Sequence, residues 1–431
     1  MKKQAVLFLK TPLAIPIFFL LLIGFQQNTY SSNSIVNDSI GYNSYRGIVI
    51  DGKTKEPLVF ATITVNETNI STVTNTKGAF LLKVPKRNKS KSITISFLGY
   101  TSKVVNLSDF NKDETTITLE TYIEELSEIK ITTKDAPSLV KEVFKRKAQN
   151  YLAVNTEMTG FYRETIKKRN TYVSLAEAIL IINKPSYTTE RNDILQLHKS
   201  RKNTNYEKLD TITLKHSGGP YDMIRLDIIK NPELLLTDEM FKNYDFTFDT
   251  STKIDNRVIY VVNFKQKPAS QDALFFGKLF IDANSLALTA VQFQVDLSDI
   301  NKASDFFIVR KPQRAKVKPI QANYFTKYAE KNGKWFHSYS RIELGFKIDW
   351  HKKIFNSIFY STMELAITDW KPDTSAASIR NRDRLRQSVI MADEASGFND
   401  PEFWGEFNVI EPEKPIENAI KKIQKQLEKM E

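Results

Sequence analysis

Short stretches of alternating apolar and polar residues run through most of this chain, and they constrain its fold more than any other feature. In one of them, Ala61, Ile63 and Val65 alternate with threonines. Such alternation places one face of a β-strand in a core and the other toward solvent. Residues 45–121 contain roughly seven such stretches separated by turn residues, which predicts a Greek-key β-sandwich.

Two dipeptides predict hairpin turns, because Asn, Asp and Gly tolerate the positive φ that tight turns need. Asp51-Gly52 follows the first stretch, and Asn332-Gly333 separates two later ones. A third hairpin is predicted where residues 280–282 lead into residues 286–288.

Longer alternating stretches follow the sandwich and predict a second, larger module. We expect an α+β domain over residues 136–370, built on a large antiparallel sheet that could take the form of a half-barrel. The fold class is therefore mainly β. Residues 221–246 carry helical and loop patterns instead of strand patterns. The predicted strands are 158–166, 172–182, 258–264, 274–281, 287–295, 320–328, 335–348 and 354–367.

Two helices are predicted at the borders of this module. Asp135 is a suitable N-cap and Pro137 suits a first helical turn, which places a helix directly after residue 135. Near the C-terminus, apolar residues from Ile416 to Met430 recur every three or four positions, with Lys and Glu between them. This spacing predicts an amphipathic helix that docks on the sheet or on a partner.

The first residues resemble an export signal. Lys2, Lys3 and Lys10 precede an apolar run over residues 12–25, and polar residues begin at Gln26. The run is shorter than the roughly 20 apolar residues of a membrane span, so a secretory signal peptide over residues 1–32 is expected, with an uncleaved anchor as the alternative. The remaining predicted divisions are the sandwich at 45–121, a linker at 122–135, the large domain at 136–370 and a polar extension at 371–431.

The sandwich segment resembles the carboxypeptidase-regulatory-like domain in the order and spacing of its motifs. The matching phrases are Tyr45-Arg46-Gly47-Ile48-Val49-Ile50-Asp51, Glu56-Pro57-Leu58, Ala61-Thr62-Ile63-Thr64-Val65, Thr74-Asn75-Thr76-Lys77-Gly78-Ala79-Phe80 and Ile95-Ser96-Phe97-Leu98-Gly99-Tyr100. The resemblance implies a transthyretin-like fold without catalytic residues of its own, of a kind that precedes other modules in envelope proteins.

The rest of the chain resembles a family of uncharacterised bacterial envelope proteins that carry this domain. The shared phrases are Gly160-Phe161-Tyr162-Arg163-Glu164, Leu175-Ala176-Glu177-Ala178 and Asp400-Pro401-Glu402-Phe403-Trp404-Gly405. This resemblance implies an envelope location, in the periplasm or at the outer membrane, and assigns no reaction.

Positive charge is concentrated in one part of the chain. The formal net charge is +12, and residues 301–353 hold 13 Lys and Arg against 4 Asp and Glu. This stretch could contact an anionic membrane surface, or it could be a solvated sheet face. An exported protein rarely meets nucleic acid, so no nucleic-acid partner is expected. The sequence has no cysteine, which excludes a lipid-bearing lipobox, disulfides and thiolate zinc sites.

A search for catalytic motifs assigns no catalytic, cofactor-binding or metal-binding residue. The four histidines, His198, His216, His337 and His351, form no zinc-peptidase motif and are interpreted as surface or turn residues. Glu164 and Glu177 lie on adjacent predicted strands and are the best pair of acids for hydrolysis, although an ion-paired structural role suits Glu164 better. No cofactor is implied.

These observations leave three functional hypotheses. The first is an exported, non-catalytic envelope binding or scaffold protein, whose partner is another envelope protein, a lipid or a glycan. The second is a carboxylate-based hydrolase using Glu164 and Glu177. The third is a small outer-membrane protein, or the soluble part of a receptor-like one.

Overall fold

The structure, a computed structural model, describes most of the chain beyond its first 40 residues. Described are residues 41–110, 114–122, 135–204, 219–254, 257–267, 275–301, 303, 315–350, 356–373, 380–395, 403–413 and 416. The predicted signal peptide, all of the linker but its two ends, and all of the C-terminal amphipathic helix except Ile416 lie outside these residues. Residues 40–431 form one compact unit.

The N-terminal module is a β-sandwich, as predicted. Its strands form a three-stranded sheet in the order β4-β1-β7 and a four-stranded sheet in the order β3-β2-β5-β6. Alternate residues of both sheets, such as Val49, Leu82, Ile63 and Ile95, meet in one buried core. The strands are β1 (Tyr42–Asp51), β2 (Thr62–Val65), β3 (Ser71–Val73), β4 (Ala79–Pro85), β5 (Ser92–Ser96), β6 (Lys103–Asn106) and β7 (Thr115–Leu119), with a 3-10 helix at Leu107–Asp109.

The turn predicted at Asp51-Gly52 is present: the chain reverses there, and Ile50 pairs antiparallel with Pro57 in an isolated bridge. The Asp51 carboxylate accepts hydrogen bonds from the backbone N–H groups of Lys53 and Thr54. The next strand, however, pairs in the other sheet, and the positive φ falls on Lys55. The turn after Asp51 is therefore wider than a two-residue hairpin, and the chain that returns from it enters the other sheet at β2.

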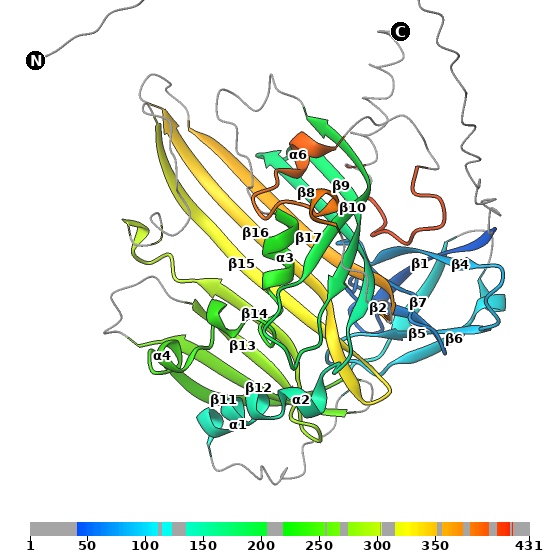
Figure 1. Ribbon diagram of the computed structural model, residues 1–431, viewed down its shortest axis with the longest axis horizontal. Coiled ribbons are helices and arrows are strands. Elements are labelled where there is room, and N and C mark those ends of the chain that lie inside the picture. Colours follow the sequence, from blue (N-terminus) through cyan, green and yellow to red (C-terminus); the bar gives the residue numbers. More distant parts are fainter. Residues whose placement is uncertain are drawn as a thin grey trace, which may run out of the picture. The chain divides into compact units, whose positions relative to one another are not determined.

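The larger module is built on one antiparallel ten-stranded sheet in the order β10-β9-β8-β17-β16-β15-β14-β13-β12-β11. The strands β10 and β11 are its two edges, so the sheet is open (Figure 1). The prediction of a mainly β fold with a large antiparallel sheet is confirmed. The strands are β8 (Thr156–Lys168), β9 (Thr171–Lys184), β10 (Ile194–Thr204), β11 (Tyr244–Ile254), β12 (Arg257–Gln266), β13 (Phe275–Asp282), β14 (Leu288–Val295), β15 (Ala315–Lys331), β16 (Lys334–Trp350) and β17 (Ser357–Pro372).

All eight predicted strands of this module are present, and two were missed. β10 was missed because its pairing with β9 shifts register between Leu197 and Lys199. This irregularity interrupts the alternation of apolar and polar residues along the strand. β11 begins inside the region interpreted as helix and loop. The hairpin at Asn332-Gly333 is confirmed, since both residues have positive φ between β15 and β16.

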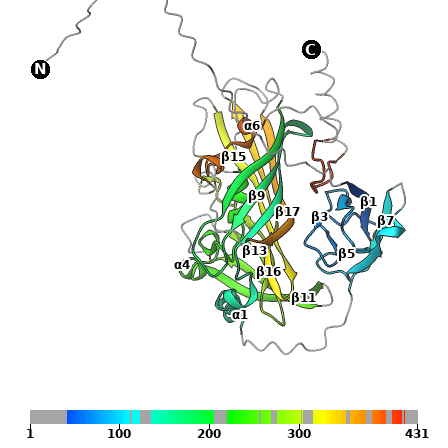
Figure 2. The same cartoon turned by 45° about the vertical axis from the view of Figure 1, so that its right-hand side comes forward.

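Helices cover one face of the large sheet, here called the inner face. As predicted, α1 (Ala136–Lys145) is capped by Asp135, whose side chain accepts from the Ser138 N–H. Figure 1 shows α1 near β11 and α3 (Gly219–Arg225) against the middle strands, and Figure 2 shows α1 on the side of the large sheet away from the sandwich strands. The other helices are α2 (Lys147–Asn150), α4 (Asp238–Phe241) and α6 (Met391–Glu394), with 3-10 helices at Pro232–Leu234 and Asn381–Asp383.

The inner face is filled by the protein's own side chains. Leu139 and Val143 of α1, and Met223 and Ile224 of α3, join the inward residues of the strands in one large core. The concave apolar lining that a lipid-carrying half-barrel would expose is therefore occupied by packed core in the described residues.

The opposite, outer face of the sheet contacts the sandwich. The side chains of Asn69 and Ser71 donate hydrogen bonds to the carbonyl groups of Trp370 and Ile367 on β17. Val73 packs with Phe161 in a shared apolar cluster. None of the helices in the described residues is both long and apolar enough to cross a membrane.

Candidate functional site

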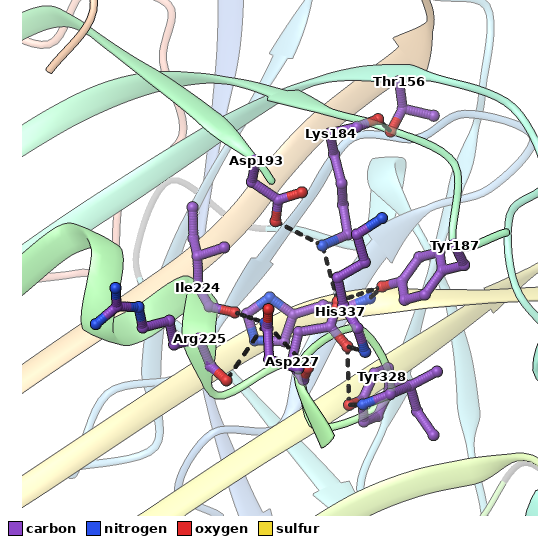
Figure 3. Close-up of polar contacts among 12 residues, drawn as sticks. Thr156, Lys184, Tyr187, Asp193, Ile224, Arg225, Asp227, Tyr328 and His337 are labelled. Atoms are coloured by element: carbon purple, nitrogen blue, oxygen red, sulfur yellow. Dashed lines mark hydrogen bonds and ion pairs between the residues drawn. The ribbon is translucent and has the colours of Figure 1, made fainter. Parts of the chain in front are cut away.

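A buried polar cluster lies on the inner face (Figure 3). The Lys184 ammonium group, at the end of β9, is 2.9 Å from a carboxylate oxygen of Asp193 and 2.8 Å from one of Asp227. The hydroxyl groups of Tyr187 and Tyr328 donate to Asp227 at 2.6 and 3.0 Å. One lysine thus joins two acids that come from segments flanking β10 and α3.

The charges of this cluster compensate one another. Burial alone would raise the pKa of Asp227, but Lys184 outweighs it and holds that pKa below its usual value. Burial would likewise lower the pKa of Lys184, and the two acids raise it instead. Because these groups are buried and mutually paired, the cluster fastens the end of β9 to the segment after α3.

His337 borders this cluster, and its interpretation as a surface or turn residue is wrong. It lies inside β16 with 2% of its surface exposed, and its backbone N–H donates to the Tyr187 hydroxyl at 3.0 Å. Burial lowers the pKa of the imidazole to about 4, so the ring is neutral at pH 7. His198 is exposed on β10 as expected, edge-on to Phe407, and His216 and His351 lie outside the described residues.

The two acids considered for hydrolysis do not converge. Glu177 lies opposite Arg163 in the β8–β9 register, and Glu164 is the next residue along β8. Successive strand residues point to opposite faces, so the two carboxylates lie on different sides of the sheet. Glu164 accepts a hydrogen bond from the Tyr162 hydroxyl at 2.7 Å on the inner face. Glu177 is fully buried on the outer face.

Glu177 belongs to a row of alternating charges that crosses five neighbouring strands on the outer face. Its carboxylate lies 2.6 Å from Arg163 and 2.7 Å from Arg201. Glu364 continues the row at 3.5 Å from Arg163 and 2.9 Å from Arg341. We call these residues the outer-face ion row: Arg201 on β10, Glu177 on β9, Arg163 on β8, Glu364 on β17 and Arg341 on β16.

A C-terminal strap, residues 403–413, covers part of this row and also contacts the sandwich. Arg163 donates to the carbonyl oxygen of Ile410 at 2.6 Å, and Trp404 packs on Arg201. On the sandwich side, the Asn408 side chain accepts from the backbone N–H of Lys83 and donates to its carbonyl group. The strap therefore bonds to both modules at once.

A cleft with a cavity volume of about 340 Å³ lies between the sandwich and the outer face of β14–β16. One wall comes from the sandwich and includes Phe60, Phe97 and Leu98. The facing wall includes Phe325 on β15 and Gln292 on β14. A concave site with mostly apolar walls and a few polar groups is typical of small-molecule binding.

Bonds between the two modules hold the cleft open at fixed positions. The Lys327 ammonium group donates to the carbonyl oxygen of Phe60 at 2.9 Å. On the other side, the Gly99 N–H donates to the carbonyl oxygen of Lys253 on β11 at 2.6 Å. Part of the basic stretch 301–353 is thus used for contact with the sandwich.

The cleft between the two modules was not predicted from the sequence. Gln292 and Gln294 alternate with the buried Val291 and Phe293, so their position on the outer face of a strand was readable from the sequence. The sequence carried no signal that the sandwich lies over that face. Among the described residues, no group of three or more acids or histidines is arranged to hold a metal ion.

Comparison with known proteins identifies the N-terminal module. Residues 45–131 match the model of the CarboxypepD_reg-like domain, which supports the resemblance seen in the sequence. The match covers less than half of the chain, and no family is shown for the rest. The comparison with curated proteins gave no match.

Solved structures give distant likenesses only. A DUF1329 family protein from Desulfovibrio piger is 9% identical, with a TM-score of 0.24, covering 57% of this chain and 96% of that one. A LolA superfamily protein from Nitrosomonas europaea is 9% identical, with a TM-score of 0.24, covering 60% and 100%. Lipovitellin is 10% identical, with a TM-score of 0.28, covering 56% and 28%. Scores this low do not establish a shared fold.

Proposed function

We propose that this protein is exported to the cell envelope and binds a ligand there, without catalysing a reaction, in the cleft between its CarboxypepD_reg-like domain and its large sheet. The observation that carries the proposal is the cleft itself. Both modules contribute its walls, and hydrogen bonds on either side, from Lys327 to the Phe60 carbonyl group and from the Gly99 N–H to the Lys253 carbonyl group, connect them. A preformed concave site of this size suits a ligand of modest size.

The arrangement of the buried acids favours binding over hydrolysis. Hydrolysis by paired carboxylates needs two acids roughly 5–10 Å apart on the same side of a substrate. Glu164 and Glu177 lie on opposite faces of the sheet, and Glu177 is held between two arginines. The hydrolase hypothesis therefore loses its best pair. The signal peptide that the sequence predicts at residues 1–32 supports the proposed location.

A cleft-filling substitution tests the binding proposal. The neutral fluorophore Nile red becomes brighter in an apolar site, and we expect the purified full chain to enhance its fluorescence. Gln292→Trp places bulk at an exposed position in the cleft and should abolish this enhancement. Val104→Trp is the matched control, since Val104 is 63% exposed on β6 and does not line the cleft.

The location is tested by adding an affinity tag to the full chain and fractionating the cells that express it. We expect the tagged protein in the cell-envelope fraction. Equal fluorescence from the two tryptophan variants, or recovery of the chain in the cytoplasm, would contradict the proposal.

A further inference from the structure

We propose that the cleft takes an uncharged carbohydrate chain. This inference rests on the proposed function and names its ligand class. Three properties of the cleft carry it: its charged side chains are already paired, two glutamine amides on one strand face are available to a ligand, and its apolar walls continue into a second hollow.

The charged side chains that line the cleft have partners within the protein. The Arg341 guanidinium lies 2.7 Å from Glu343 and 2.9 Å from Glu364. Lys327 donates to the Phe60 carbonyl group and packs near the Tyr339 ring. A charged ligand would have to break one of these partly buried pairs, and uncompensated charge at such a site is costly. The cleft is therefore suited to a ligand without net charge.

Two glutamine amides remain available to a ligand. Gln292 and Gln294 occupy alternate positions of β14 and so share its outer face. Neither side chain makes a hydrogen bond to another of the described residues. An amide offers both donors and an acceptor, the combination that hydroxyl groups on adjacent sugar carbons can satisfy.

The apolar walls distinguish a sugar from an acyl chain. Pyranose rings present C–H faces that pack on flat side chains such as Phe97 and Phe325, while their hydroxyl rims reach the amides. An acyl chain would fill the same walls but would cover the amides without bonding them. Each polar group left unsatisfied in this way weakens the binding of an acyl chain.

The cleft is long enough for several sugar units. A second hollow of about 320 Å³ lies over β12–β14 and shares Gln292 and Gln294 with the first. Phe276, 37% exposed, and Asn263 line this second hollow, together with Lys278, which pairs with Asp249 at 2.8 Å, and the solvent-exposed Lys265. The two amides thus stand at the junction of two adjoining hollows, which fits an extended oligosaccharide better than a single sugar.

Calorimetric titration of the full chain tests the ligand class. The probes are cellohexaose, maltohexaose and mannohexaose as neutral sugars, hexagalacturonate as an anionic sugar and lauric acid as an acyl chain. We expect at least one neutral hexasaccharide to bind. Gln292→Leu combined with Gln294→Leu should weaken that binding by about tenfold or more, since each lost hydrogen bond contributes on the order of 1 kcal/mol.

Two comparisons keep this test separate from that of the proposed function. Gln387→Leu, an exposed glutamine away from the cleft, should leave sugar binding unchanged. The leucine double variant should still enhance Nile red fluorescence, because it keeps the apolar walls. If Nile red binds and no neutral sugar does, or if hexagalacturonate or lauric acid binds more tightly, the carbohydrate inference fails alone. If no probe binds, the proposed function fails with it.

Discussion

Buried polar residues on the two faces of the large sheet differ in how they are compensated. On the inner face, Asp227 accepts from two tyrosine hydroxyl groups and pairs with Lys184. His337 lies beside this network without a hydrogen-bond partner for its Nε2 atom among the described residues. The imidazole is therefore held neutral mainly by its removal from water, and protonation would place a charge in the core.

His337 makes the stability of the fold depend on pH. The pKa of its imidazole is about 4 when folded and 6.5 in the unfolded chain, so the unfolded state binds more protons between these values. The contribution is fully present above pH 6.5, and it is lost as pH falls toward 4. The loss is on the order of 3 kcal/mol.

Urea unfolding of the wild type and of His337→Gln at pH 7 and pH 4.5 measures this effect. The variant should lose less stability than the wild type between the two pH values, whereas His198→Gln, at an exposed position, should behave as the wild type does. A loss of stability as large in His337→Gln as in the wild type would contradict the assignment.

Strand pairing on the outer face is reinforced by the outer-face ion row. Burial would raise the pKa of Glu177, but Arg163 and Arg201 outweigh it and hold the carboxylate charged. Each member of the row bridges strands that are neighbours in the sheet. On the outer face beneath the strap, complementary charges therefore hold neighbouring strands together, whereas apolar packing does so on the inner face.

Removing the charge of Glu177 should destabilise the sheet strongly. Glu177→Gln leaves two buried arginines without their shared partner, and breaking a buried ion pair typically costs about 3–5 kcal/mol. Glu157→Gln, on the neighbouring strand β8, removes a more exposed pair with Lys371 and should cost about 1 kcal/mol or less. Denaturant midpoints of both variants check the difference, and similar losses would contradict the importance of burial.

Local sequence patterns predicted most elements, and their failures have physical causes. Alternation found eight strands of the large sheet. The same alternation is present at Tyr244 and Phe246 of β11, but these residues lie at the end of region 221–246, which the preceding helical and loop patterns predicted not to be a strand. The burial of His337 and the opposite orientations of Glu164 and Glu177 depend on register. The cleft exists because the sandwich docks on the outer face of the large sheet, and local sequence patterns do not predict where one module docks on another.

At the scale of the molecule, the strap links modules that are distant in sequence. Arg46 of β1 pairs with Glu411 at 2.7 Å, and the Asn75 amide donates to the Glu411 carbonyl group at 3.0 Å. On the sheet, Trp404 packs edge-on against Phe161. Because the strap bonds to both modules, the contact that forms the cleft walls is expected to weaken without it.

Truncation tests the role of the strap. A chain ending at residue 400 lacks it, whereas a chain ending at residue 416 keeps it. We expect scanning calorimetry to resolve separate unfolding of the two modules in the shorter chain, and one cooperative transition in the longer chain and the wild type. Identical transitions in all three chains would show that the strap does not hold the modules together.

The β8–β17 pairing has a consequence for how the chain matures. Thr159 and Thr368, whose segments pair in the middle of the sheet, are 209 positions apart. A ribosome releases the N-terminal partner first, so a growing chain leaves one long side of β8 without a mate until almost all of it has been synthesised. A strand edge with unpaired backbone N–H and C=O groups can pair with other chains and so promote aggregation. Molecular chaperones that shield nascent polypeptides would therefore matter most for this protein during that interval.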